Sequence, residues 1–239
     1  MKPEFLDDRE LAAYLNLTLD DIRQRVKYRE IPFQSRGRRV LFCKNDIDAW
    51  ASQRILHLSE RALSDYHRDS TRGAAGHVPP QALLPQLLQP GFVAPAMTSK
   101  TKASVLRDLA KLAESTGRLN DPAALLESLV AREELCSTGI PGGIALPHPR
   151  NHDPYLSESS FIIAGRTVQP VNFGAPDGEP TELFFLICCQ DDRLHLHTLA
   201  RLCRIAQKTD LVARINFLSD PETFFQGLVA AEQEVLAGG

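Results

Sequence analysis

The sequence has no long hydrophobic run and little net charge, and these shortages exclude several classes of protein. None of its apolar stretches approaches the roughly 18 residues that a membrane-spanning helix needs, so we expect no membrane insertion. The amino terminus, MKPEFLDDRE, is acidic and lacks the apolar core of a signal peptide, which predicts a cytoplasmic location. A net charge of −3 over 239 residues says nothing about partners by itself.

The cysteines argue against a disulfide-rich protein, and the overall organisation argues against a repeat protein. Five cysteines make an odd number without regular spacing, and Cys188 and Cys189 lie in the apolar run LFFLICC, so we expect reduced thiols rather than a disulfide framework. The chain has no internal repeat and no low-complexity tract, and its length suits one large domain or two unequal ones.

The charge is unevenly distributed along the chain. Residues 1–56 carry 11 basic and 9 acidic side chains, a net charge of +2 that leaves −5 for the rest. Within residues 21–44 there are eight basic side chains and two acidic ones. This asymmetry indicates that the amino-terminal part meets a negatively charged partner.

Composition divides the chain into three segments. Residues 57–80 lack sustained periodicity and end in Gly, Ala and a Pro-Pro pair, which is typical of a linker, here with room for a helical start. We therefore predict a small domain over residues 1–56, a linker over 57–80 and a large domain over 81–239.

The pattern of residues 1–56 predicts two helices, a hairpin and a third helix. The stretch TLDD matches a capping box before the second helix, and Gly37 permits a tight turn in SRGRR. Two helices joined by a short turn and followed by a basic hairpin suit a groove of DNA. The candidate DNA-binding residues are Arg23, Arg25, Lys27, Arg36, Arg38 and Arg39.

Three short motifs in this part carry a resemblance. ELAAYL (10–15), SRGRR (35–39) and DIDAW (46–50) resemble the small winged helix-turn-helix domains of the excisionase and MerR type. This resemblance implies DNA binding. Because one such module offers a small footprint, we expect a homo-oligomer for specific binding. A charged helix on a protein-docking module is the alternative interpretation.

Residues 81–239 alternate helix and strand signals. Asp121 followed by Pro122, and Asp220 followed by Pro221, are typical helix starts, and SFIIAGR and TELFFLICC predict strands, the second central. Helices interleaved with buried strands imply the α/β class, here an α/β sandwich on a mixed sheet.

Helical phase separates the two histidines of RLHLHTLARL. His195 shares its direction with the apolar stripe of Leu199 and Leu202, so it faces the domain body from the first turn of the helix. His197 points the other way with Arg201, which predicts a solvated side chain. His57, His67 and His77 fall in the predicted linker, where no role is expected.

The histidine of GIALPHPR ends an apolar run between two prolines. The ordered motifs REELCSTGIPGGIALPH, PVNFGAPDGEPTELFFLICC and HLHTLARL resemble the enzyme IIA domains of the sugar phosphotransferase system, in the fructose, mannitol and nitrogen-regulatory class. The resemblance spans roughly residues 82–236. It implies that His148 is the phosphoryl acceptor, that His195 is its companion and that Arg132 completes the site. Pro149 departs from the pattern and removes a backbone donor.

This constellation suits phosphoryl transfer. A neutral imidazole nitrogen is a good nucleophile near pH 7, and a guanidinium offsets charge on the moving group. We expect His148 to be open to solvent at the exit of a strand, opposite His195 and Arg132. No metal or other cofactor is expected.

Three functions fit these features. The first is a phosphorylation-controlled regulator in which an HPr-type phosphocarrier phosphorylates His148 and the helix-turn-helix binds DNA. The second is a IIA component that passes phosphate to a separate IIB subunit in sugar uptake. The third is a metal hydrolase using His148, His152, Asp153 and the pair His195 and His197. Pro149 disfavours it because it prevents a helix between His148 and His152, and His195 and His197 face opposite sides of a helix.

Overall fold

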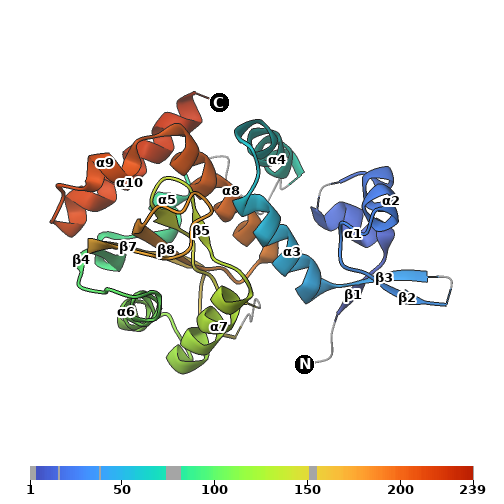
Figure 1. Cartoon of the computed structure of the whole chain (residues 1–239), viewed down its shortest axis with the longest axis horizontal. Coiled ribbons are helices and arrows are strands. Elements are labelled where there is room, and N and C mark those ends of the chain that lie inside the picture. The colour runs from blue at the N-terminus through green and yellow to red at the C-terminus, as the bar shows by residue number, and fades with distance from the viewer. Residues whose placement is uncertain (1–3, 16, 38, 74–81, 151–154, 239) are drawn as a thin grey trace.

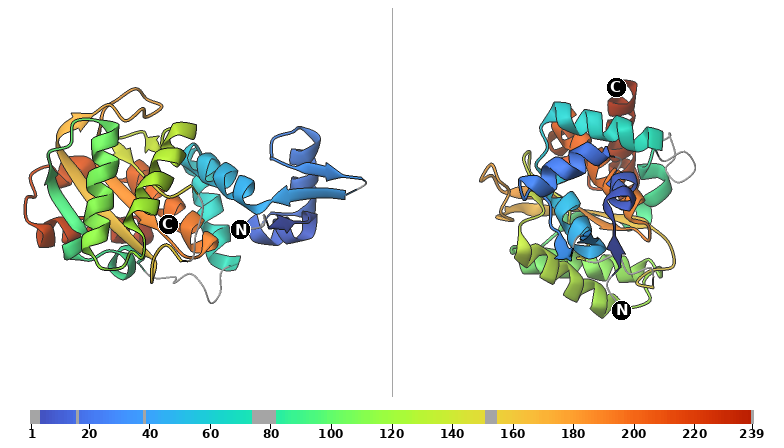
Figure 2. Two further views of the ribbon diagram at one scale, coloured as in Figure 1. Left: turned by 90° about the horizontal axis from the view of Figure 1, so that it is seen from below. Right: turned by 90° about the vertical axis from the view of Figure 1, so that its right-hand side faces the viewer.

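The computed structural model describes residues 4–15, 17–37, 39–73, 82–150 and 155–238. Figure 1 shows a large domain built around a sheet and a smaller group of elements that stands off from it, with helix α3 leading from one to the other. The left view in Figure 2 shows the same arrangement. Arg38, His77, His152 and Asp153 lie outside the described residues.

The small domain has the predicted helix-turn-helix and hairpin. Its sheet has the antiparallel order β1-β3-β2. Asp7 caps the first helix by accepting from the amides of Arg9 and Glu10, and the Thr18–Asp21 capping box starts the second. Gly37 adopts the positive φ that the hairpin turn requires. The elements are α1 (Asp8–Leu15), α2 (Leu19–Lys27), β1 (Phe5–Leu6), β2 (Gln34–Arg36) and β3 (Arg39–Cys43).

The large domain is built on a mixed five-stranded sheet of order β4-β7-β8-β6-β5. The pairs β4–β7 and β6–β8 are parallel, whereas β7–β8 and β5–β6 are antiparallel. Strand β8 occupies the centre, which confirms the interpretation of TELFFLICC. The strands are β4 (Val93–Met97), β5 (Gly139–Ile140), β6 (Ile144–Ala145), β7 (Phe161–Val171) and β8 (Thr181–Cys188).

Helices cover both faces of this sheet, so the predicted α/β sandwich is confirmed. Figure 1 shows α6 and α7 on one face and α8, α9 and α10 on the other. Asp121, Asp191 and Asp220 each accept a backbone amide at a helix start. The helices are α5 (Leu84–Leu87), the 3-10 turn η1 (Pro90–Phe92), α6 (Lys102–Ser115), α7 (Pro122–Leu135), α8 (Asp192–Lys208), α9 (Leu211–Ile215) and α10 (Pro221–Ala237).

Two further helices join the small domain to the large one. Helix α3 (Lys44–Leu56) places Ile47, Ala51 and Ile55 in the hydrophobic core. Helix α4 (Glu60–Gly73) lies in the segment predicted as a linker, and both α3 and α4 pack against α8. The segment is therefore helical over much of its length and is seated on the large domain.

The prediction that His197 is solvated is wrong. His197 is 1% exposed because α4 covers this side of α8, where the His67 ring stacks on the His197 ring with centroids 4.6 Å apart. His67, which was expected to have no role in a linker, accepts from Arg201 Nε at 2.8 Å. Arg201 also pairs with the buried carboxylate of Glu232 at 2.7 Å. A connected polar network thus holds α4 in place.

Acidification is expected to loosen α4 from α8. Burial, reinforced by the charges of Arg201 and Arg204, lowers the pKa of His197 to about 3, and burial with the same neighbours and His197 lowers the pKa of His67 to about 2. Glu232 faces the network through Arg201. While α4 is packed on α8, both rings therefore stay neutral. When α4 detaches, the two rings become exposed and bind protons once the pH falls below about 6.5. The free energy of packing α4 on α8 is therefore most favourable above pH 6.5 and becomes less favourable as the pH drops.

The size of this effect follows from the linkage between protonation and docking. Each histidine costs about 1.4 kcal/mol of docking free energy per pH unit, or about 2 kcal/mol between pH 6.5 and pH 5. Amide hydrogen exchange over residues 60–68, corrected for intrinsic rates, should show loss of protection at pH 5 relative to pH 7.5. Helix α6, which contains no histidine, is the internal control. Equal protection of residues 60–68 at both pH values would contradict the expectation.

Candidate functional site

The residues predicted to form one site come together from three elements. His148 follows strand β6, Arg132 lies in the last turn of α7, and His195 lies in the first turn of α8. The His148 and His195 rings have centroids 4.8 Å apart, and Arg132 Nε lies 3.1 Å from His148 Nε2. The structure therefore places an imidazole pair and a guanidinium within contact of one another.

Backbone geometry fixes the state of the His148 ring. Its Nδ1 lies 2.8 Å from the carbonyl oxygen of Leu146, and a carbonyl can only accept, so Nδ1 carries the proton. The lone pair of a neutral ring is then on Nε2, where it accepts from Arg132 Nε. The nucleophilic nitrogen thus points at the guanidinium. No pattern in the sequence predicts this role for the carbonyl of Leu146.

Arg132 is held rigidly and retains an unused donor. The residue is 2% exposed, and its Nη1 donates to the carbonyl oxygen of Cys136 at 3.0 Å and to Cys136 Sγ at 3.3 Å. Its Nη2 is buried and has no hydrogen-bond partner among the residues that the structure describes. A buried donor without an acceptor is costly, so this nitrogen is suited to an anion beside His148.

The neighbouring Glu133 anchors the end of α7. Its carboxylate accepts from Lys102 Nζ at 2.9 Å and from the Thr138 amide and hydroxyl. These bonds tie the helix that carries Arg132 to the chain leading into β5. Glu133 was not identified from the sequence, although it directly follows Arg132 in the REEL motif.

The expectation that His148 is open to solvent is wrong for this structure. His148 is 2% exposed and His195 is fully buried. Ser52 of α3 places its hydroxyl oxygen 3.3 Å from His195 Nε2, and Lys44 at the start of α3 forms an ion pair with Asp192 at the start of α8. Helix α3 thus places a side chain against His195, and no pattern within either domain alone predicts this contact.

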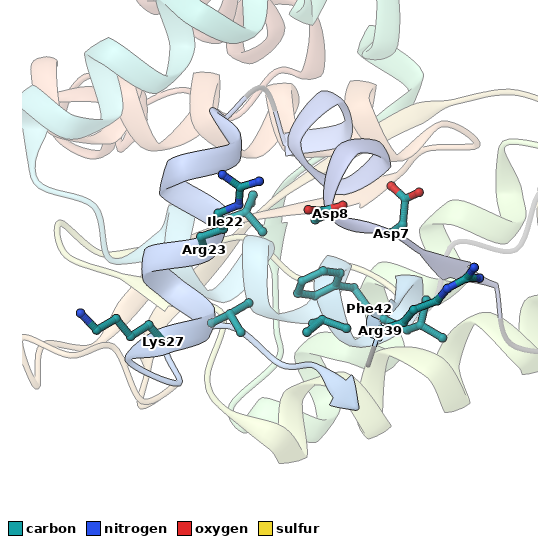
Figure 3. A pocket seen from close by; sticks show the side chains of 10 residues that line it. Asp7, Asp8, Ile22, Arg23, Lys27, Arg39 and Phe42 are labelled. Carbon is teal, nitrogen blue, oxygen red and sulfur yellow. The ribbon is translucent and has the colours of Figure 1, made fainter. Parts of the chain in front are cut away.

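Some of the predicted DNA-binding residues gather on one surface of the small domain. Arg23 and Lys27 of α2 and Arg39 of β3 are exposed and line a cavity of about 680 Å³ whose floor includes Ile22 and Phe42. Figure 3 shows Arg23 and Lys27 on one side of the cavity, and Arg39 with Asp7 and Asp8 on the other. Arg36 is exposed in β2 with its guanidinium 4.7 Å from the centroid of the Phe5 ring.

Arg25 is not brought together with this group. Its guanidinium lies 5.9 Å from the centroid of the Trp50 ring and pairs with Glu30 at 3.4 Å. It lines a separate cavity of about 520 Å³ with Trp50 and Arg54. Arg25 therefore occupies a different side of α2 from Arg23 and Lys27.

The described residues form neither a metal site nor a membrane-spanning helix. Within the described ranges, no group of three or more His, Cys, Asp or Glu side chains is arranged to hold a metal ion. Along the same residues, no helix combines the length and the apolar character needed to span a bilayer.

Comparison with known families is decisive for the large domain. Residues 86–230 match the family described as "Phosphoenolpyruvate-dependent sugar phosphotransferase system, EIIA 2". The chain belongs to this EIIA 2 family. Residues 5–63 match a helix-turn-helix domain, so an EIIA 2 domain and a helix-turn-helix domain are joined in one chain.

Relatives of the EIIA 2 domain include regulators and sugar transporters. The chain is 32% identical over 145 residues to a nitrogen regulatory protein of Bradyrhizobium diazoefficiens, covering 59% of this chain and 92% of that protein. It is 31% identical over 115 residues to the fructose-specific EIIABC component of Bacillus subtilis, covering 47% of this chain and 18% of that protein.

Solved structures share the fold of the EIIA 2 domain. The nitrogen regulatory protein IIA-Ntr of Neisseria meningitidis aligns with a TM-score of 0.55 and 28% identity, covering 62% of this chain and 99% of that one. The IIA mannitol protein of Escherichia coli aligns with a TM-score of 0.51 and 17% identity, covering 62% and 98% respectively.

Proposed function

We propose that His148 of the EIIA 2 domain accepts a phosphoryl group from an HPr-type phosphocarrier, and that the helix-turn-helix domain binds DNA. The chain would then be a cytoplasmic regulator of the nitrogen-regulatory type. The observation that carries this proposal is the orientation of His148, whose Nδ1 proton is held by Leu146 while Nε2 faces Arg132.

The proposed transfer balances without movement of a proton. The lone pair on Nε2 attacks the phosphorus of the phosphorylated imidazole on the carrier, so that one N–P bond forms while the other breaks. The carrier ring, protonated on its other nitrogen, leaves as a neutral imidazole, and the proton on Nδ1 of His148 stays on that nitrogen, which donates it to the carbonyl oxygen of Leu146. Such a transfer depends mainly on positioning and on stabilisation of charge on the phosphoryl oxygens.

Arg132 and His195 are suited to that stabilisation. Arg132 Nη2 is a buried donor without a partner in the described part of the chain, and a phosphoryl oxygen would supply its acceptor. His195 lies in the first turn of α8, where backbone amides and the helix dipole favour negative charge. We propose that Arg132 binds the phosphoryl group and that His195 donates to one of its oxygens.

The first experiment maps the phosphorylated residue. Phosphorylated HPr, generated with enzyme I and phosphoenolpyruvate, is incubated with the purified chain, and the acid-labile adduct is located by mass spectrometry. The proposal expects one phosphoryl group on the peptide that contains His148. Modification at another residue, or none after prolonged incubation, would contradict it.

The case for DNA binding rests on the exposed cations of the small domain. Arg23, Lys27 and Arg39 share one surface, and Arg36 lies exposed in β2 of the adjoining hairpin. Exposed arginine and lysine side chains near a helix and a hairpin are suited to contact phosphates on either side of a groove. Arg38 remains part of the proposal although it is outside the described residues, whereas the ion pair of Arg25 makes it the weakest member. A homo-oligomer would supply the second half of a specific footprint.

The substitution Arg39→Ala is expected to weaken DNA binding by about tenfold at 0.1 M salt, because one contact to a DNA phosphate is lost. The slope of log K against log salt concentration should also fall by about 1. Fluorescence anisotropy with a fragment from the promoter region of its own gene provides both values. Arg107→Ala removes the same charge from an exposed position on α6 and should leave affinity unchanged. An unaltered salt slope for Arg39→Ala would exclude the contact.

A second candidate function is transfer to a separate IIB subunit during sugar uptake. It is favoured by the 31% identity to the fructose-specific EIIABC component. In addition, the mannitol IIA of Escherichia coli, which shares the fold, has been solved in complex with a phosphorylated IIB. Passage of label from the phosphorylated chain to a purified IIB domain would favour this function, whereas retention of label would favour the regulator.

A further inference from the structure

Helices α3 and α4 form an interdomain contact along α8, the helix that carries His195 of the proposed phosphoryl-acceptor site. At one end Lys44 pairs with Asp192, and in the middle Ser52 meets His195. At the other end the carbonyl oxygen of Leu58 accepts from Gln207, and α4 places His67 on His197. These partners all lie on α8, the helix that carries His195.

The contact conflicts with the reaction proposed for His148. The donor is an imidazole on another protein, and its nitrogen must approach Nε2 of His148 in line with the N–P bond. His148 is 2% exposed, His195 is fully buried and Ser52 is 2% exposed. A side chain of a separate protein cannot reach rings that are covered in this way.

We propose that seating of α3 and α4 on α8 closes the phosphoryl-acceptor site, and that His148 is phosphorylated only while these helices are displaced. This inference rests on the proposed function and names its regulation. The helix that closes the site also carries the DNA-binding elements, since α3 follows directly from β3.

The chemistry of the contact suits reversible opening. Its ion pairs are partly exposed, with side-chain exposures of 23% for Lys44 and 12% for Asp192, and 28% for Lys208 with 65% for Glu60. Polar contacts between domains of one chain resemble transient interfaces. The observed rate of phosphorylation is then the rate of the open arrangement multiplied by the fraction of molecules that are open.

Coupling between the two events is reciprocal. If the closed arrangement leaves no room for a phosphoryl group on Nε2, that group favours the open arrangement by the same factor by which opening favours the phosphorylated state at equilibrium. Phosphorylation therefore releases α3 from α8 and frees the small domain from its seat. DNA binding would respond through the position of the small domain, without any contact between phosphate and DNA.

Charge reversal at Lys44 tests the closure. Lys44→Glu places a carboxylate against Asp192 and near Asp48, both of which Lys44 now faces. The initial rate of labelling by phosphorylated HPr should rise by about tenfold or more. A negative charge near the site would by itself slow the approach of a phosphorylated donor, so an increase in rate reports opening of the site.

Two further variants complete the test. Lys111→Glu makes the same charge change on the exposed face of α6 and should label at the wild-type rate. Ser52→Arg directs a long side chain at His195 and should also accelerate labelling, because it cannot fit between α3 and α8. Thermal unfolding followed by circular dichroism verifies that each variant is folded.

The outcomes separate this inference from the proposed function. Faster labelling of both Lys44→Glu and Ser52→Arg, with Lys111→Glu unchanged, supports closure by α3. Labelling of wild type at His148 at the same rate as both variants overturns closure but leaves the proposed function intact. Absence of label from wild type and from both opened variants overturns the proposed function.

Discussion

The substitution His148→Ala is expected to abolish phosphorylation of the chain by phosphorylated HPr. The reason is that His148 Nε2 is the nitrogen in this site whose lone pair is aligned by a fixed tautomer, with the carbonyl of Leu146 holding the proton on Nδ1. The methyl group of alanine offers no nucleophile, and label should remain at background in gel autoradiography. The same result is expected when His148→Ala is combined with Lys44→Glu, because opening the site cannot replace the missing nitrogen.

A matched control distinguishes loss of the acceptor from loss of a histidine in general. His57→Ala changes an exposed histidine at the end of α3, whose Nδ1 lies 2.7 Å from the carbonyl oxygen of Gln53. This variant should still be labelled to completion. Persistent labelling of His148→Ala would show that another residue, with His195 as the nearest candidate, accepts the phosphoryl group.

The substitution Arg132→Met is expected to slow phosphorylation of His148 by about 100- to 1,000-fold. This is the usual effect of removing a preorganised hydrogen-bond donor from a developing charge. Arg132 brings Nε to His148 and leaves Nη2 as a buried donor, while Nη1 is anchored on Cys136. Methionine keeps much of the length of the side chain but loses the charge and all three donor nitrogens.

A comparison with Arg132→Lys shows whether charge alone is sufficient. Lysine retains the charge but has a single nitrogen, which cannot contact both Cys136 and the phosphoryl group in the planar geometry of a guanidinium. Its rate should fall between those of wild type and Arg132→Met. Rapid-quench measurement of labelling in the Lys44→Glu background isolates the transfer from opening of the site. A wild-type rate for Arg132→Met would exclude Arg132 from charge stabilisation.

Local signals in the sequence predicted much of the fold. Asp121 before Pro122 marks the start of α7, and the Thr18–Asp21 box marks the start of α2, because capping depends on residues close together in the chain. The apolar run of β8 predicted its central position in the sheet. Helical phase also placed His195 correctly, since its direction follows from the residues one turn away.

Contacts between the two domains could not be predicted in this way. The phase of α8 assigned His197 to solvent, but α4 buries that side of the helix and places the His67 ring against the His197 ring. A histidine in a polar segment gives no hydrophobic signal. Ser52 and Asp48, one turn apart on α3, likewise form a polar stripe that has the appearance of a solvated face until α8 lies against it.

Helix α3 belongs to two structures at once, and this determines where the protein can be divided. Trp50 donates to the carbonyl oxygen of Glu30 in the small domain, whereas Ser52 and Lys44 contact α8. A truncated chain that begins after residue 56 would lack the helix that contacts both the small domain and α8. A chimera that exchanges residues 1–56 would need a replacement helix that makes the same contacts with α8. Protein engineering on this scaffold is therefore best done by retaining α3 and α4 and replacing the residues that precede Lys44.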